Sequence, residues 1–182
     1  MREACHSQAA VISSNTAGNH GGGIYLAGGG TAAKTVIENN TASQQGGGVN
    51  FNQGQGSGLL LSCIVRGNVG GVGGGFYLFK GTVRNTLVYN NSAANAGGGQ
   101  VDQGDFQNCT IVSNRATSGV GGLFLGSGAL IENTIVYFNE GTNYAQGGGS
   151  PTFRNTCSLP LPTGVGNTAS DPQFVSAAAE DF

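Results

Sequence analysis

Charged residues and long apolar runs are both scarce in this chain. Only 9% of its 182 residues are charged, and the formal net charge is −2. The sequence has no basic patch, so nucleic acid is not an expected partner. It also has no run of about 18 apolar residues and thus predicts no membrane span, and the first residues, Met1 to Ala4, lack the pattern of a signal peptide.

Uninterrupted helix-forming stretches are missing as well. The 35 glycines interrupt every window of the sequence, and a glycine costs about 1 kcal/mol at a helical position. A repeat protein built from helices is therefore excluded, and any repeated unit must be built from strands.

The sequence does contain one motif that occurs six times. The motif is an aliphatic residue, two variable residues, an asparagine, a short spacer and a glycine run. Its asparagines are separated by 25, 28, 23, 23 and 25 residues, and they are Asn15, Asn40, Asn68, Asn91, Asn114 and Asn139. A period of this length predicts a solenoid with one supersecondary unit per repeat.

Alignment of the repeats on the asparagine shows where the strands lie. Branched or small residues stand three and five positions before it, as at Ile12 and Ala10, which is the period-two pattern of an inward strand face. A second strand is predicted after the glycines, as at Val49 and Phe51, and a third before the next repeat, as at Leu60. The pattern predicts an all-β, single-stranded parallel β-helix of about six to seven coils, with three short strands per coil.

Each alignment column becomes a stack in such a fold, with a spacing of roughly 4.8 Å. The aliphatic stack forms the core, and each member contributes on the order of 1.5–3 kcal/mol when fully buried. The asparagine stack can hydrogen-bond amide to amide from coil to coil. The glycines supply positive φ angles and close backbone approach at a corner. The repeated motif is thus explained by its structural role in the solenoid.

The motifs Ile-x-x-Asn and Val-x-x-Asn are followed by GGGI at 21–24, GGGV at 46–49 and GGGF at 73–76. They resemble the paired GGAI and FxxN motifs of polymorphic outer membrane proteins. The run Asn-Cys-Thr-Ile at 108–111 is similar to pectate-lyase-like right-handed β-helix repeats of secreted bacterial proteins. The resemblance covers about residues 9–155. It implies a right-handed helix, a secreted or cell-surface location, and either an adhesin-like passenger or a carbohydrate-active scaffold.

We assign residues 1–156 to the β-helix array, as a fragment of a longer domain, and residues 157–182 to a loop-rich segment that closes or leaves the solenoid. Pro160 and Pro162 stop regular strand pairing there. No amphipathic helix covers the first coil, and an open strand edge invites pairing between molecules. We therefore expect that uncapped solenoid ends allow oligomers to form.

Two of the four cysteines fall within the repeats. Cys63 and Cys109 share one column, two coils apart, which is roughly 9.6 Å and beyond the limit of about 7 Å for a disulfide. We expect them to be small buried hydrophobic residues. Cys5 and Cys157 lie at opposite ends of the array, and there is no Cys-x-x-Cys motif. The sequence thus predicts neither a metal site nor a cofactor.

Asp102 and Asp105 are the only close pair of carboxylates within the repeats. General acid–base catalysis needs at least one positioned proton-transfer pair. With Lys80 and Arg84 one coil earlier, these two aspartates are the candidates for a catalytic site. The alternative is a polar turn where the fourth repeat loses its pattern. The stretched sixth repeat, at 141–149, is the other place where the pattern falters.

Outward aromatic residues suggest binding. Tyr25, Tyr77 and Phe124 share one column on alternate coils, and Tyr89 and Tyr137 share another. Regularly spaced exposed rings can stack on the sugar rings of a polysaccharide. The alternative is that strands favour aromatic residues on a half-covered face.

We therefore expect a structural or adhesive β-helix segment of a secreted or cell-surface bacterial protein, with no catalytic site. Its expected partner is a polysaccharide or another cell-surface ligand. The alternatives are a polysaccharide-binding module and a fragment of a pectate-lyase-like polysaccharide lyase or hydrolase.

Overall fold

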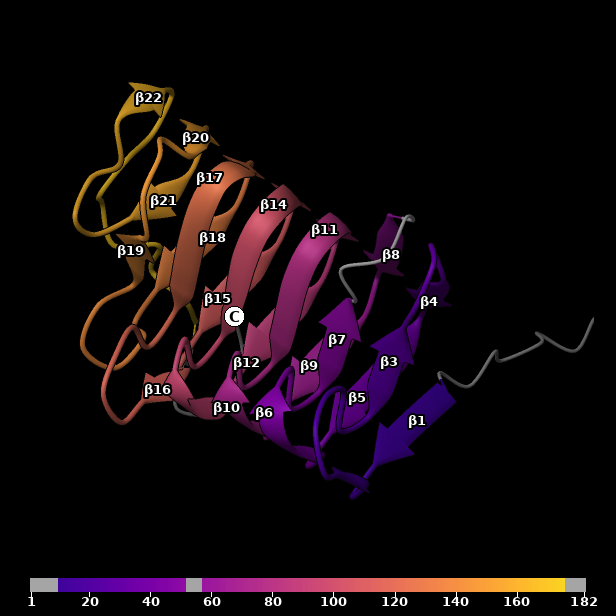
Figure 1. Cartoon of the computed structure of the whole chain (residues 1–182). Helices are drawn as coiled ribbons and strands as arrows, with labels where there is room; N and C mark the ends of the chain where they lie inside the picture. The colour runs from indigo at the N-terminus through magenta and orange to yellow at the C-terminus, as the bar shows by residue number, and fades with distance from the viewer. Residues whose placement is uncertain (1–9, 52–56, 176–182) are drawn as a thin grey trace, which may run out of the picture.

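The computed structural model describes residues 10–51 and 57–175, and these residues form 22 β-strands. The strands are stacked as a solenoid of about six turns, which runs from the indigo N-terminal end to the yellow C-terminal end in Figure 1. Parallel pairing joins the turns, so the predicted all-β parallel β-helix is confirmed. None of the described residues forms a helix, and hence none forms one that could cross a membrane.

Sheet A is formed by the strands that precede the repeated asparagines. Its register joins equivalent residues, for example Ile12 with Ile37 and Val65 with Val88, so the alignment columns are stacks as predicted. Its strands, in order, are β1 (Ala10–Ser13), β5 (Thr35–Glu38), β9 (Ile64–Arg66), β12 (Leu87–Tyr89), β15 (Thr110–Val112), β18 (Ile135–Tyr137) and β21 (Cys157–Ser158).

Sheet B lies between the asparagines and the glycine runs, where the sequence predicted only a spacer. Its order is β16-β13-β10-β6-β2. The strands are β2 (Thr16–Ala17), β6 (Thr41–Gln45), β10 (Val69–Val72), β13 (Ser92–Asn95) and β16 (Arg115–Ala116). Its buried positions hold Ala42, Gly70 and Ala93. Such small residues give no visible hydrophobic alternation, which is why the pattern missed this sheet.

Sheet C contains both of the other predicted strands. They remain separate in the first two turns, as β3 (Ile24–Leu26), β4 (Thr31–Ala33), β7 (Val49–Phe51) and β8 (Gly58–Leu61). In the next three turns they join into single strands, β11 (Phe76–Arg84), β14 (Gly99–Gln107) and β17 (Leu123–Glu132). The sheet ends with β19 (Tyr144–Gln146), β20 (Thr152–Arg154) and β22 (Gly164–Val165). Sheets A, B and C are thus the three sides of the first five turns.

The long strands β11 and β14 of sheet C bend at a column of glycines. Leu78 and Val83 are both fully buried although they are five positions apart, an odd spacing that a straight strand cannot place on one face. Between them lies Gly81, which is the register neighbour of Gly58 and Gly104. Its φ of +148° is a conformation that L side chains rarely adopt. The bend re-aims the outward side chains that follow it.

The repeated asparagines form a continuous ladder, as predicted, and those from Asn40 to Asn139 are buried. The side-chain Nδ2 of each donates to the Oδ1 of the next, at 2.9–3.1 Å along Asn15, Asn40, Asn68, Asn91, Asn114, Asn139 and finally Asn143. The backbone N–H of each donor residue reaches the same Oδ1 at 2.9–3.0 Å. Every ladder bond therefore points toward the C-terminal end.

Each Nδ2 within the ladder also makes a second bond, to the carbonyl of the aliphatic residue in the preceding turn. Asn91 Nδ2 donates to Val65 O at 2.9 Å. The ladder ends in the stretched sixth repeat, where Asn143 Nδ2 donates to Leu159 O at 2.9 Å. Inside the ladder both amide hydrogens and both acceptor sites of Oδ1 are used.

One glycine in each of the first five runs packs against the ladder asparagine of the next turn, and these glycines are Gly23, Gly48, Gly75, Gly98 and Gly122. A Cβ atom on Gly48 would lie 2.9 Å from Asn68 Nδ2 and 2.6 Å from the carbonyl oxygen of Gly75. No side chain fits in this space. The sequence pattern suggested separate structural roles for the asparagines and for the glycines. The structure shows that the glycines of one turn contact the asparagine of the next.

The cysteines of the repeats are buried, as predicted. Cys63 and Cys109 are each 3% exposed, and neither they nor Cys157 forms a disulfide among the described residues, while Cys5 lies outside those residues. The Cys109 thiol donates to the carbonyl of Gln107 at 3.2 Å. Burial raises the pKa of Cys109 to about 12. At neutral pH this side chain is therefore an uncharged thiol.

Thiol labelling should separate these cysteines. At pH 8 we expect iodoacetamide to modify Cys157, which is partly exposed, while Cys109 stays unmodified in the folded protein. With a pKa of about 12, only about one Cys109 in 10⁴ is a thiolate at that pH. Time-resolved peptide mass spectrometry measures both rates, with the unfolded chain in guanidinium as the control. Native labelling of Cys109 as fast as that of Cys157 would contradict the buried position.

Candidate functional site

The aromatic column predicted on sheet C is present, but one of its three rings is buried. Tyr25, Tyr77 and Phe124 alternate with Asn50 and Gln100 in the register of neighbouring strands. Tyr25 is 46% exposed and Phe124 is partly exposed, but Tyr77 is only 5% exposed. The shared column is confirmed, and the expected exposure of the Tyr77 ring is wrong. Alternation predicts the face to which a side chain points, but not what covers it.

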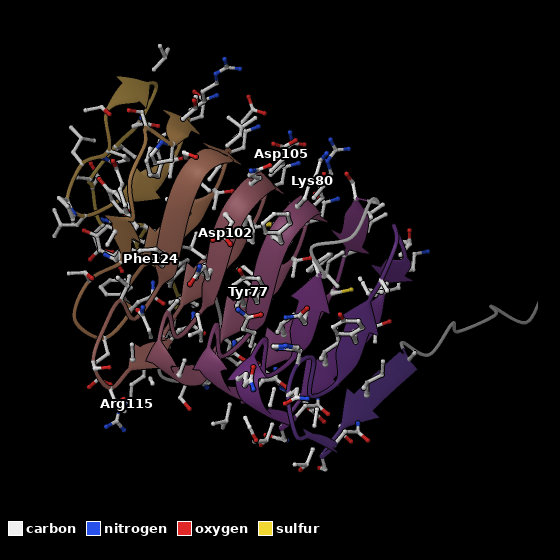
Figure 2. All side chains as sticks on the ribbon, viewed as in Figure 1. Tyr77, Lys80, Asp102, Asp105, Arg115 and Phe124 are labelled. Atoms are coloured by element: carbon white, nitrogen blue, oxygen red, sulfur yellow. The ribbon has the colours of Figure 1, made fainter. Side chains whose placement is uncertain are left out.

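Tyr77 is tied to one of the two candidate aspartates. Its hydroxyl donates to Asp102 Oδ2 at 2.6 Å, and Gln100 Nε2 donates to Asp102 Oδ1 at 2.8 Å. Both carboxylate oxygens thus accept a hydrogen bond within sheet C, and bonds to a charged acceptor are the stronger kind. Figure 2 shows Tyr77 and Asp102 on the neighbouring strands β11 and β14. This carboxylate joins two turns of the scaffold.

The second aspartate lies in a hollow of about 270 Å³ at the bend of the same strands. The hollow is lined by Ser57, Lys80, Gly81, Thr82, Gln103, Gly104, Asp105 and Gly128. Lys80 and Asp105 contribute opposite charges, and Figure 2 shows both at one rim of the sheet, apart from Asp102. Three glycines leave bare backbone between these polar side chains. A ligand with hydroxyl or carboxylate groups would find both donors and acceptors here.

Asp102 and Asp105 thus have different surroundings. They lie three residues apart on an extended strand, which separates their Cα atoms by up to about 10 Å. Asp102 bonds to Tyr77 and Gln100, whereas Asp105 faces the hollow with Lys80. Arg84 is the register neighbour of Gln107 and does not line the hollow. The prediction that the chain has no catalytic site, with these two aspartates as the only candidates, stays a prediction.

The second aromatic column is on sheet A, where Tyr89 and Tyr137 both neighbour Val112 as predicted. Tyr89 is only 4% exposed. Its hydroxyl accepts a hydrogen bond from Arg66 at 2.8 Å, and the guanidinium carbon lies 6.0 Å from the ring centre. Arg66 also pairs with Glu38 at 2.7 Å. These bonds, first to Tyr89 and then to Glu38, raise the pKa of Arg66, so the side chain stays cationic.

Tyr137 is covered by Phe138 and by the C-terminal segment of the chain. It is 9% exposed, its hydroxyl donates to Ala169 O at 3.1 Å, and its ring meets the Phe138 ring at 4.8 Å. Phe138 in turn packs near Phe174, with ring centres 6.1 Å apart. The C-terminal segment therefore lies over this part of sheet A. The expectation that Tyr89 and Tyr137 present exposed rings is wrong, because an arginine and this segment cover them.

The stretched sixth repeat was the other place where the sequence pattern falters. Asn143, inside it, accepts the last ladder bond from Asn139. The repeat is longer because the chain turns back to supply the next ladder asparagine itself. Its irregularity thus ends the asparagine ladder at Asn143. β21 and β22 follow beyond residue 156 and still pair with sheets A and C, and the domain boundary at 156 remains a prediction.

Sequence reasoning missed the hollow on sheet C. Its signal was the glycine column at Gly58, Gly81 and Gly104, which marks a bend in the strands with Lys80 and Asp105 beside it. Within residues 10–51 and 57–175, no three His, Cys, Asp or Glu side chains are grouped so that they could hold a metal ion.

Comparison with known protein families identified a family for this chain. The family model described as right handed beta helix region matches residues 3–158. Comparison with the curated proteins and with the solved structures gave no match.

Proposed function

Because the chain belongs to the right-handed β-helix family, we propose that it is a structural, adhesive segment of a secreted or cell-surface protein and has no catalytic site. The observation behind this proposal is the role of Asp102. Both of its carboxylate oxygens accept hydrogen bonds, from Tyr77 and Gln100. A carboxylate engaged in this way stabilises the contact between turns and is poorly placed to exchange a proton with a ligand.

The ligand that best suits the surface is a polysaccharide bound along sheet C. The hollow at the bend supplies a cation, a carboxylate, a hydroxyl and an amide, from Lys80, Asp105, Thr82 and Gln103. Tyr25 is an exposed ring on the outward face of the same sheet. Sugar chains are recognised by such a combination of polar groups and aromatic faces. The strand spacing of about 4.8 Å lets an extended ligand contact several turns.

A polysaccharide lyase or hydrolase fragment is the alternative. The observation in its favour is that Asp105 lies beside Lys80 in a hollow and not in a structural contact of the kind that holds Asp102. Hydrolysis by paired carboxylates would require a second acid near Asp105. The experiment below therefore measures binding and bond cleavage separately.

Purified protein should bind to at least one member of a panel of immobilised acidic and neutral polysaccharides without releasing products. We expect Lys80→Ala and Asp105→Asn each to weaken that binding about tenfold, which corresponds to about 1.4 kcal/mol. Arg115→Ala is the matched control, because Arg115 is exposed on sheet B and pairs only at the surface with Glu140, at 3.2 Å.

Two outcomes would count against the proposal. New reducing ends or unsaturated products, lost in Asp105→Asn, would show that the chain is an enzyme. Equal binding by the Lys80→Ala variant and the Arg115→Ala control would place the ligand away from the hollow.

A further inference from the structure

The hollow at the bend of sheet C holds its two charged side chains at diagonal positions. Lys80 is the register neighbour of Gln103, and Thr82 is the register neighbour of Asp105. The cation and the carboxylate are therefore separated by one strand spacing and by two residues along a strand, which places their Cα atoms no more than about 8 Å apart. An amide and a hydroxyl occupy the other two positions of this arrangement.

The two charges of the hollow are not neutralised within the described residues. Neither Lys80 nor Asp105 forms an ion pair or a side-chain hydrogen bond with another described residue. Elsewhere on the solenoid, opposite charges that are direct register neighbours do pair, as Glu38 and Arg66 do at 2.7 Å. The diagonal offset thus leaves a cation and a carboxylate in one hollow, each available to a ligand.

The floor and the flanks of the hollow suit a sugar ring. Gly81 and Gly104 lie between the polar side chains and leave the backbone bare. Leu59 and Leu130 flank the column of outward side chains that holds Asp105, and both are partly exposed. The polar centre is thus bordered by apolar side chains that can contact the C–H groups of a carbohydrate.

The two charges distinguish between classes of polysaccharide. A purely acidic polymer is attracted by Lys80 and repelled by Asp105, and a purely basic polymer meets the reverse situation. A neutral polymer leaves both charges without a counter-charge. A polymer that carries carboxylates and free amino groups satisfies both at once, because the two charges of the protein face one hollow of about 270 Å³.

We propose, on the basis of the proposed polysaccharide binding along sheet C, that the hollow selects a zwitterionic polysaccharide, in which carboxylates and unsubstituted amino groups alternate along the chain. Lys80 pairs with a carboxylate of the ligand, and Asp105 pairs with an ammonium group. Gln103 and Thr82 hydrogen-bond to hydroxyl groups of the same sugars. The site thus responds to the positions of both charges and not to the net charge of the polymer.

Chemically matched polymers test this selection. Hyaluronan alternates a carboxylate with an N-acetylated amino sugar, and removal of its acetyl groups makes it zwitterionic. Chitosan carries the amino groups without the carboxylates, and dextran is neutral. Surface plasmon resonance at pH 6, where the free amino groups are charged, compares the four polymers at equal chain length. We expect N-deacetylated hyaluronan to bind at least about fivefold more tightly than any of the other three.

Two conservative variants separate the two contacts. Lys80→Gln should remove the preference for the zwitterionic polymer over chitosan, because the carboxylates lose their partner. Asp105→Asn should remove the preference over hyaluronan, because the amino groups lose theirs. Arg84→Gln is the matched control and should keep both preferences, because Arg84 is an exposed cation on the same strand that does not line the hollow.

The possible failures of the two proposals are distinguishable. If dextran, hyaluronan or chitosan bound as tightly as the zwitterionic polymer, the ligand class would be overturned while polysaccharide binding stood. If no polymer bound, the proposed function would be overturned as well. If Arg84→Gln removed the preferences as fully as Lys80→Gln and Asp105→Asn do, the general charge of sheet C and not the hollow would select the ligand, which would also overturn the inference.

Discussion

Replacing Asn91 with alanine is expected to lower the free energy of unfolding by about 4 kcal/mol. The change removes two bonds received from Asn68, both of 3.0 Å, and two bonds donated by Asn91 Nδ2, to Asn114 Oδ1 at 3.0 Å and to Val65 O at 2.9 Å. The groups left without a partner are buried, and each such group costs about 1–3 kcal/mol. The backbone N–H of Asn91 keeps its bond to Asn114.

Urea or guanidinium unfolding measures this loss, and Asn15→Ala is the matched control. Asn15 occupies the same position in the repeated motif, but it is exposed and receives no ladder bond among the described residues. We expect Asn15→Ala to cost less than about 1.5 kcal/mol. If both variants lost the same stability, burial of the ladder would not be the source of its strength.

Gly48→Ala is expected to cost about 3 kcal/mol or more, or to prevent folding. The added Cβ would lie 2.6 Å from the carbonyl oxygen of Gly75 and 2.9 Å from Asn68 Nδ2. Neither neighbour can move away easily, because Gly75 belongs to the adjacent turn and Asn68 is held by the ladder. The substitution therefore pushes apart two turns that their backbone hydrogen bonds hold together.

Gly18→Ala is the control for the glycine prediction. No atom lies within 4 Å of the position where its Cβ would be, so the expected change is within about 0.5 kcal/mol. Thermal and chemical unfolding of both variants provides the comparison. A Gly48→Ala variant as stable as Gly18→Ala would show that the turns tolerate a wider spacing.

The repeated motif made most of the fold predictable from the sequence. The aliphatic column, the asparagine stack and the glycine corners each follow from the residue type at one position of the motif. Because the turns stack in register, the same residue type recurs at the same place in every turn. Sheet B was not predicted, because its buried positions hold Ala42, Gly70 and Ala93 and so give no apolar alternation. The bend of sheet C at Gly81 was also missed, because an isolated glycine does not indicate which way a strand turns.

The candidate site was less predictable for a related reason. Alternation correctly placed Tyr77 and Tyr89 on outward columns, but their exposure depends on side chains one turn away in the sequence. Tyr77 is bonded to Asp102, 25 residues later, and Tyr89 is covered by Arg66, 23 residues earlier. The geometry between turns decides such contacts. A single aligned column does not record it.

The directional ladder also determines how the molecule responds to tension. Each turn is held mainly by its nearest neighbours, and the C-terminal end is secured by Asn143 and Leu159. A pull on the N-terminal end therefore loads one turn at a time and releases about 25 residues, or roughly 85 Å of chain, at each step. A segment that yields in this way lengthens stepwise under load, while the remaining turns stay folded.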